Sequence, residues 1–254
     1  RVTIEGGLIG GTDTNDANKA TGTGTDNGMG GGIWVGDTCS LNLKDSTDPS
    51  SGVQRLRILG NLAQKGTGIY AKNTIVSMKD TLQINTNNDV YLDSGAQIRA
   101  DGALSPPGGI TARITVPDSE YNMSRQVLIA ATSSVMLANE THKFTVTPKG
   151  SQYWVVKNDG YLSNTTTDIF ANISKNQIQA AESSMNYTET NPIINRKAKL
   201  LNKLILYKTS ENNYGIMHVT AVDDTTPGSI TFSYKTFKSD GSMKKRDNNH
   251  TEDG

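Results

Sequence analysis

The feature that most restricts the fold of this chain is an internal repeat. Residues Gly31 to Asp45 (GGIWVGDTCSLNLKD) align with Gly66 to Asp80 (GTGIYAKNTIVSMKD) when one gap is allowed. Each copy holds a short apolar strand, a polar corner and an alternating strand that ends in Lys-Asp. A third version covers Asp89 to Ala100, and Val2 to Gly11 resembles the end of an earlier copy. Equivalent positions keep their residue type, so the copies are expected to stack in register.

Strands this short, three to a unit of about 20 to 35 residues, cannot bury an apolar face alone. A third strand ending in Asn separates the copies, at Ile58 to Asn61 and again at Ile84 to Asn87. The repeat therefore predicts an all-β fold dominated by a short right-handed parallel β-helix, whose inward side chains form ladders from coil to coil. The expected ladders are Ile33/Ile69/Val90, Val35/Ala71/Leu92 and Leu43/Met78/Ile98. An antiparallel sandwich of short strands is the competing architecture.

Composition excludes several classes of protein. The 254 residues carry 25 basic and 25 acidic side chains, so no overall field attracts nucleic acid. Hydrophobic residues make up 34% of the chain, and no apolar run approaches the roughly 18 residues of a membrane span. The single cysteine, Cys39, allows neither an internal disulfide nor a thiolate metal cluster.

The pieces GGGIWV, GTGIYA and NDVYLDSGAQI resemble the coils of repeat-rich bacterial surface proteins, of the kind found in spirochaetes and, more loosely, the polymorphic outer-membrane proteins of chlamydiae. The resemblance covers residues 1–163. It implies a right-handed parallel β-helix displayed on the cell surface or secreted, often with a role in adhesion. It also implies a closing segment after the last coil, matched here by Ile110 to Val116, Gln126 to Ile129, Lys143 to Thr147 and Tyr153 to Leu162.

Three parts are expected along the chain. Residues 1–109 form the coils, residues 110–163 form a β cap over their last strand edge, and residues 164–254 form a small α+β module. In this module a helix is predicted from Asp168, its N-cap, to Met185. An antiparallel meander is predicted over Leu204 to Tyr207, Tyr214 to Val222 and Ser229 to Phe237, before a frayed polar tail from Lys244 to Gly254.

Candidate chemical sites are weak. Asp45 and Asp80 occupy matching positions, but each follows a Lys at a predicted corner, which favours a solvated corner over a pair of catalytic carboxylates. Residues 13–18 (DTNDAN) are rich in oxygen ligands, yet their order does not fit a calcium loop. Five basic residues, Arg196, Lys197, Lys199, Lys203 and Lys208, are expected to protect an exposed strand edge rather than bind an anionic polymer. We therefore expect no metal, no cofactor and no catalytic residue.

The favoured binding feature is aromatic. Trp34, Tyr70 and Tyr91 hold the same outward position in three copies, so their rings should stand roughly 4.8 Å apart along the stack. An exposed aromatic ladder of this kind could stack on sugar rings or anchor a protein. The alternative is that a long corner, such as Ser46 to Gly52, folds over the ladder and buries it.

These observations predict a non-enzymatic bacterial protein, extracellular or on the cell surface, that binds a host glycan or matrix protein in adhesion or display. Nucleic acid is not an expected partner, and no transmembrane segment is expected in this chain. The alternative from another class is a carbohydrate-active β-helix enzyme, either a lyase or a hydrolase. A structural stalk is the third interpretation.

Overall fold

The computed structural model describes residues 1–12, 15–22, 28–48, 52–85, 87–132, 135–150, 152–182, 200–223 and 228–253. β-Strands dominate it, and the chain divides into two compact units, Arg1–Asn164 and Thr165–Gly254. Among the described residues, no helix is both long and apolar enough to cross a membrane.

The first unit is built from three parallel sheets. The first sheet has the order β1 (Val2–Glu5), β4 (Ser40–Lys44), β9 (Ile75–Asp80), β12 (Gln97–Leu104) and β14 (Leu128–Ala130). The second has the order β10 (Gln83–Ile84), β7 (Leu56–Leu59) and β2 (Gly7–Gly10). The third has the order β15 (Phe144–Val146), β13 (Ala112–Thr115), β11 (Asp89–Asp93), β8 (Ile69–Lys72) and β3 (Ile33–Val35).

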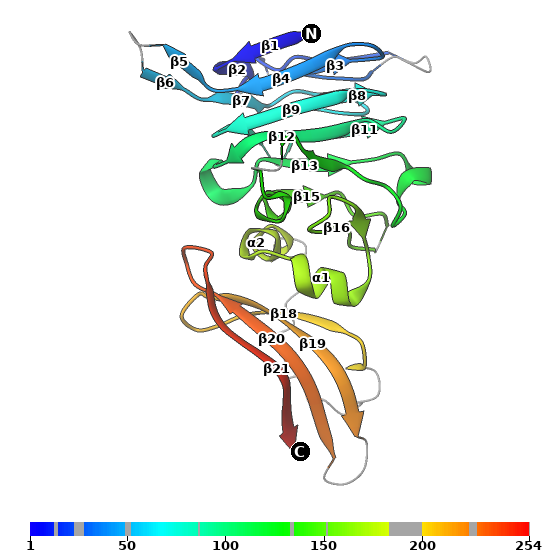
Figure 1. Ribbon diagram of the computed structural model, residues 1–254, viewed down its shortest axis with the longest axis vertical. Coiled ribbons are helices and arrows are strands. Elements are labelled where there is room, and N and C mark those ends of the chain that lie inside the picture. Colours follow the sequence, from blue (N-terminus) through cyan, green and yellow to red (C-terminus); the bar gives the residue numbers. More distant parts are fainter. Residues whose placement is uncertain are drawn as a thin grey trace. The chain divides into compact units, whose positions relative to one another are not determined.

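The chain visits these sheets in turn. The strands β1, β2 and β3 belong to the first, second and third sheet, and β4, β7 and β8 repeat that sequence, as do β9, β10 and β11. In Figure 1 the strands of this unit accordingly lie in successive layers. Because these sheet pairings are parallel, the antiparallel sandwich expected as a competing architecture does not describe these strands.

Buried ladders run between the layers. The register pairs Ile33 with Ile69 and Ile69 with Val90, and it pairs Val35 with Ala71 and Ala71 with Leu92, which confirms two predicted ladders. The third predicted ladder is wrong in its last member, because Met78 pairs with Ala100 while Ile98 pairs with Val76. Side chains alternate with a period of two, so a shift of two residues keeps the inward face and moves only the partner.

A row of asparagines joins the corners that follow the second sheet. Asn61 and Asn88 are buried. The side-chain nitrogen of Asn61, Nδ2, donates to the carbonyl oxygen of Ile9 at 3.1 Å and to Asn88 Oδ1 at 3.4 Å. The side-chain oxygen of Asn61 accepts from Asn18 Nδ2 at 3.0 Å. Asn88 Nδ2 in turn donates to the backbone carbonyl oxygen of Asn61 at 2.8 Å. The sequence repeat aligns Asn61 with Asn87, whereas the residue that bonds to Asn61 is Asn88, one position further on.

The parallel pairing continues beyond residue 109. β13 and β15 extend the third sheet and β14 extends the first, so the predicted boundary at 109/110 does not coincide with an end of the sheets. Antiparallel pairs occur at β16 (Val155–Val156) with β17 (Leu162–Ser163), and at the hairpin β5 (Ser46–Asp48) with β6 (Gly52–Gln54). Gly160 turns the first of these pairs with φ of +84°; a Cβ there would lie 1.9 Å from the Leu128 carbonyl oxygen.

The second unit places two helices on an antiparallel sheet. The helices are α1 (Thr166–Asn172) and α2 (Lys175–Glu182), and the sheet order is β18 (Leu204–Lys208), β19 (Tyr214–Asp223), β20 (Ser229–Phe237) and β21 (Met243–Asp253). The three predicted strands are confirmed. Phe170, Ile178, Tyr214, Ile216 and Phe237 form the core between the two layers.

Two expectations for this unit are wrong. The helix predicted from Asp168 is interrupted at Ile173, whose backbone is extended, and its N-cap is Thr165, which accepts from the Asp168 amide. The predicted end of the helix at Met185 lies outside the described residues. The tail from Lys244 is a strand, because the edge of β20 offers its backbone groups partners and an exposed edge strand tolerates polar side chains.

Lys235, on β20, gives this unit a pH dependence. Its ammonium group is buried, lies 5.3 Å from the centre of the Phe170 ring and donates to the carbonyl oxygens of Ala171 at 3.1 Å and Ile173 at 3.3 Å. Burial, and next the nearby Arg246, lower the pKa of Lys235 from 10.5 to about 8. Between these values the unfolded chain binds more protons than the folded one, so the free energy of unfolding should rise with pH, by about 1 kcal/mol per pH unit.

Urea titrations followed by the methyl resonances of Ile216, at pH 8.0 and 9.5, measure this rise. The variant Lys235→Met should remove it. An equal rise in the variant would assign the effect to another group.

Candidate functional site

The aromatic column lies on the outer face of the third sheet. Trp34 on β3 pairs with Tyr70 on β8, and Tyr70 pairs with Tyr91 on β11, so the predicted register of the three aromatic residues is confirmed. Thr115 on β13 continues the column beyond Tyr91. The order of the sheet places β3 at one edge, so Trp34 ends the column among the described strands.

The three rings differ in exposure. Trp34 is 56% exposed, whereas Tyr70 is 1% and Tyr91 9% exposed. The Tyr70 and Tyr91 rings stack with centroids 5.6 Å apart and planes 17° apart. The Tyr70 hydroxyl donates to Asp93, and the Lys65 ammonium lies 5.5 Å from the centre of the Tyr91 ring. The alternative of a covered ladder therefore describes Tyr70 and Tyr91, and Trp34 alone remains open to a ligand.

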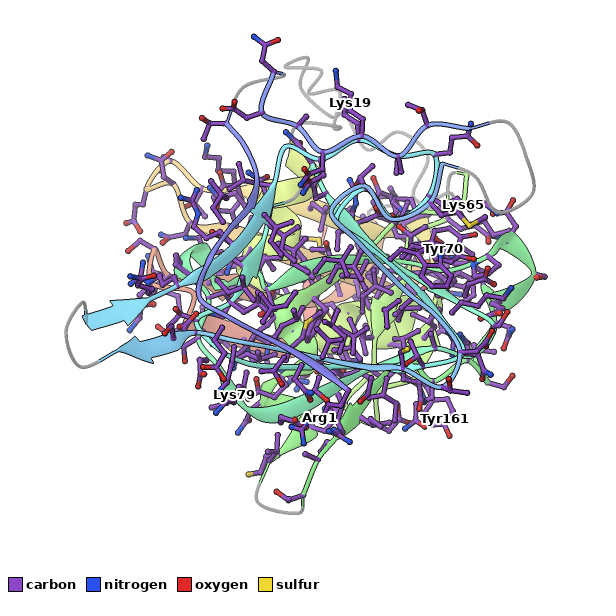
Figure 2. The ribbon with its side chains drawn as sticks, turned by 90° about the horizontal axis from the view of Figure 1, so that it is seen from above. Arg1, Lys19, Lys65, Tyr70, Lys79 and Tyr161 are labelled. Atoms are coloured by element: carbon purple, nitrogen blue, oxygen red, sulfur yellow. The ribbon has the colours of Figure 1, made fainter. Side chains whose placement is uncertain are left out.

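The cover is not the hairpin considered from the sequence. Figure 2 shows Lys65 and Tyr70 on one side of the unit, while the β5–β6 hairpin extends from the opposite side. Burial, and next the nearby carboxylates of Asp93, Asp118 and Glu120, together raise the pKa of Tyr91 to about 12. The acidic segment around Asp118 therefore stands near the covered end of the column.

The Trp34 ring packs on the backbone just after its own strand, β3. A Cβ built on Gly36 would lie 2.3 Å from the Trp34 Cη2 atom, so the indole ring rests directly on the Gly36 backbone. A ring held this way loses little further conformational freedom on binding. It presents an open apolar face beside polar corners, which is the geometry that stacks on a sugar ring or an apolar side chain.

The candidate acid/base pair does not form a site. Asp45 is buried and accepts from the amides of Leu56 at 2.9 Å and Thr81 at 3.0 Å, and from the Thr81 hydroxyl. The expected solvated corner is thus wrong for Asp45, because the amides of Leu56, at the start of β7, and of Thr81, just after β9, donate to its carboxylate. Asp80 is partly exposed and lies 3.9 Å from Lys79. The Asp45 carboxylate is thus held by backbone and hydroxyl donors and the Asp80 carboxylate lies near a lysine, so the two do not form a catalytic pair.

The remaining candidates give no converging group. In the described part of the chain, no three His, Cys, Asp or Glu side chains lie together as metal ligands would. Asp13 and Thr14 of the oxygen-rich loop, and Arg196, Lys197 and Lys199 of the basic cluster, lie outside the described residues. Of that cluster, Lys203 and Lys208 are described: Lys203 is exposed, and the Lys208 ammonium lies 5.2 Å from the centre of the Tyr214 ring.

A polar hollow on the outer face of the first sheet was missed by sequence reasoning. It encloses about 370 Å³ and is lined by Arg1, Thr3, Glu5, Asn42, Leu43, Lys44, Ser77, Lys79 and Asp101. The Lys-Asp ends of the repeated copies were the available signal, since they place charged residues at the same end of neighbouring strands.

No protein-family model matches the sequence, and neither a curated protein nor a solved structure matches it.

Proposed function

We propose that this chain is an extracellular or surface-displayed bacterial binding module, built on a right-handed parallel β-helix, that attaches to a glycan or a matrix protein. The order in which the chain visits its three sheets supports the β-helix, since each circuit returns to the sheet it left, one strand further on. Such a stack is rigid along its axis and carries its outward residues in rows, which suits display.

The observation that carries the binding role is the exposed indole of Trp34, held on Gly36 at the open end of an aromatic column. Aromatic anchors contribute much of the energy of recognition where they are rigid and accessible. Tyr70 and Tyr91 serve a different purpose in this proposal: they fix the β8 and β11 positions behind the indole by stacking and by the bond to Asp93.

The test is the variant Trp34→Ala against arrays of oligosaccharides and immobilised matrix proteins. Each matrix protein or uncharged oligosaccharide retained by the wild-type chain should bind at least about tenfold more weakly to the variant, the equivalent of about 1.4 kcal/mol. Tyr153→Ala is the matched control, because Tyr153 is also an exposed aromatic residue of the first unit. It should bind like the wild type.

Equal binding by Trp34→Ala and the wild type would refute this site. Release of reducing ends from the polysaccharides during the same incubation would instead support the carbohydrate-active enzyme. A chain that binds nothing on either array would leave the structural stalk as the better interpretation.

A further inference from the structure

The polar hollow of the first sheet is a second site, on a different face from Trp34. It lies where β1, β4 and β9 end, with Glu5, Lys44 and Lys79 at neighbouring positions. Figure 2 shows Arg1 and Lys79 on one side of the unit and Lys19 on the opposite side. Its volume of about 370 Å³ falls within the range of roughly 300–1,000 Å³ typical of small-molecule sites.

A bulge in β12 forms one rim of the hollow. Ala100 pairs with Met78 and Leu104 pairs with Asp80, so β12 uses three intervening residues where β9 has only Lys79. Such a bulge interrupts the pairing and re-aims side chains, and bulges are enriched beside functional sites. Gly102 of the bulge would place a Cβ 3.6 Å from the Lys79 Cβ, so the rim lies directly beside this lysine.

The charges of the hollow are unevenly compensated. Lys44 pairs with Glu5 at 2.7 Å, and Asp101 is held by Arg99 at 2.6 Å. Both acidic side chains that line the hollow are therefore already neutralised. Within the described part of the chain, the one ion pair of Lys79 is with Asp80, at 3.9 Å. Lys44 and Lys79 directly follow the paired residues Leu43 and Met78, so the two lysines are neighbours across the strands. Like charges side by side repel, so an anion between them would be stabilised.

The floor of the hollow carries hydroxyl and amide groups. Thr3, Asn42 and Ser77 form one row across β1, β4 and β9, and Asn42 donates to the Val2 carbonyl oxygen at 3.3 Å. An inorganic anion needs only the cations, whereas a hydroxylated ring also needs donors and acceptors across its face. The hydroxyls of Thr3 and Ser77 and the side-chain amide of Asn42 supply both donors and acceptors.

From this juxtaposition we infer that the hollow binds an acidic sugar residue, a uronic acid within a polysaccharide, with its carboxylate beside Lys79 and its hydroxyls over the Thr3–Asn42–Ser77 row. This site does not depend on the Trp34 site. Loss of one would leave the other intact.

The experiment measures binding of an oligogalacturonate and of a neutral glucan oligomer of equal length to the whole chain by calorimetry. The oligogalacturonate should bind and the neutral oligomer should bind at least tenfold more weakly. Lys79→Gln should weaken oligogalacturonate binding about fivefold, or about 1 kcal/mol. Lys19→Gln, which changes the net charge equally on the opposite side, should have no effect, and Trp34→Ala should also have none.

The inference is overturned if Lys79→Gln binds like the wild type, or if Lys19→Gln is weakened as much, which would indicate attraction by net charge alone. It is also overturned if the neutral oligomer binds equally well, or if no oligogalacturonate binding is detected. If inorganic phosphate at equal concentration displaces the oligogalacturonate completely, the hollow binds anions without recognising a sugar, and the inference is contradicted.

Discussion

Replacing Tyr70 with alanine should lower the free energy of unfolding of the first unit by about 3–5 kcal/mol. The ring is almost fully buried, stacks on Tyr91 at 5.6 Å and donates its hydroxyl to Asp93. Its removal leaves a cavity beside β8 and β11 and deprives the Asp93 carboxylate of a donor, and both changes destabilise the folded state. Urea denaturation followed by the fluorescence of Trp34 and Trp154 measures the loss.

Two related variants separate the causes. Tyr70→Phe keeps the ring and removes the hydroxyl that donates to Asp93. It should lower the free energy of unfolding by about 1.5–3 kcal/mol relative to the wild type. Trp34→Ala removes an exposed ring and should cost less than about 1 kcal/mol. If Tyr70→Ala proved as mild as Trp34→Ala, the Tyr70 ring would not be covered in solution and the whole ladder would be open to ligands.

The register of the column was predictable and its burial was not. Repetition in the sequence places Trp34, Tyr70 and Tyr91 in one row, because parallel strands of equivalent copies pair at equivalent residues. The alternation of side chains along a strand predicts which residues point to the outer face of the sheet, but not whether other segments cover that face. For Tyr70 and Tyr91 that depends on Lys65, Asp93 and the segment near Asp118, most of which lies outside the aligned copies.

Other differences have equally local causes. The bulge at residues 101–103 follows the last aligned copy, so the rim of the polar hollow has no counterpart earlier in the repeat. The polar tail pairs as β21 because its partner, β20, supplies an edge that composition alone does not reveal. The alignment gives the wrong partner at Ile98, in the shorter third copy, and at Asn87, just before that copy begins.

Replacing Asn61 with alanine should lower the free energy of unfolding of the first unit by about 2–4 kcal/mol. The side chain is buried at a corner and joins three neighbours: its amide donates to the Ile9 carbonyl and to Asn88, and its oxygen accepts from Asn18. Alanine leaves these buried groups without partners, and each unsatisfied group costs about 1–3 kcal/mol. Urea denaturation measures the loss, and hydrogen exchange of the Leu62 amide, which donates to the Asn18 carbonyl oxygen, should show faster opening of this corner.

Asn87→Ala is the control that distinguishes this row from a general requirement for asparagine at corners. Asn87 occupies the position that the sequence repeat matches to Asn61, yet its side chain is exposed and the buried partner is Asn88. The change at Asn87 should therefore stay within about 0.5 kcal/mol of the wild type, as surface substitutions usually do. Similar losses at positions 61 and 87 would mean that Asn87, and not Asn88, is the buried partner of Asn61, which would contradict the described row of asparagines.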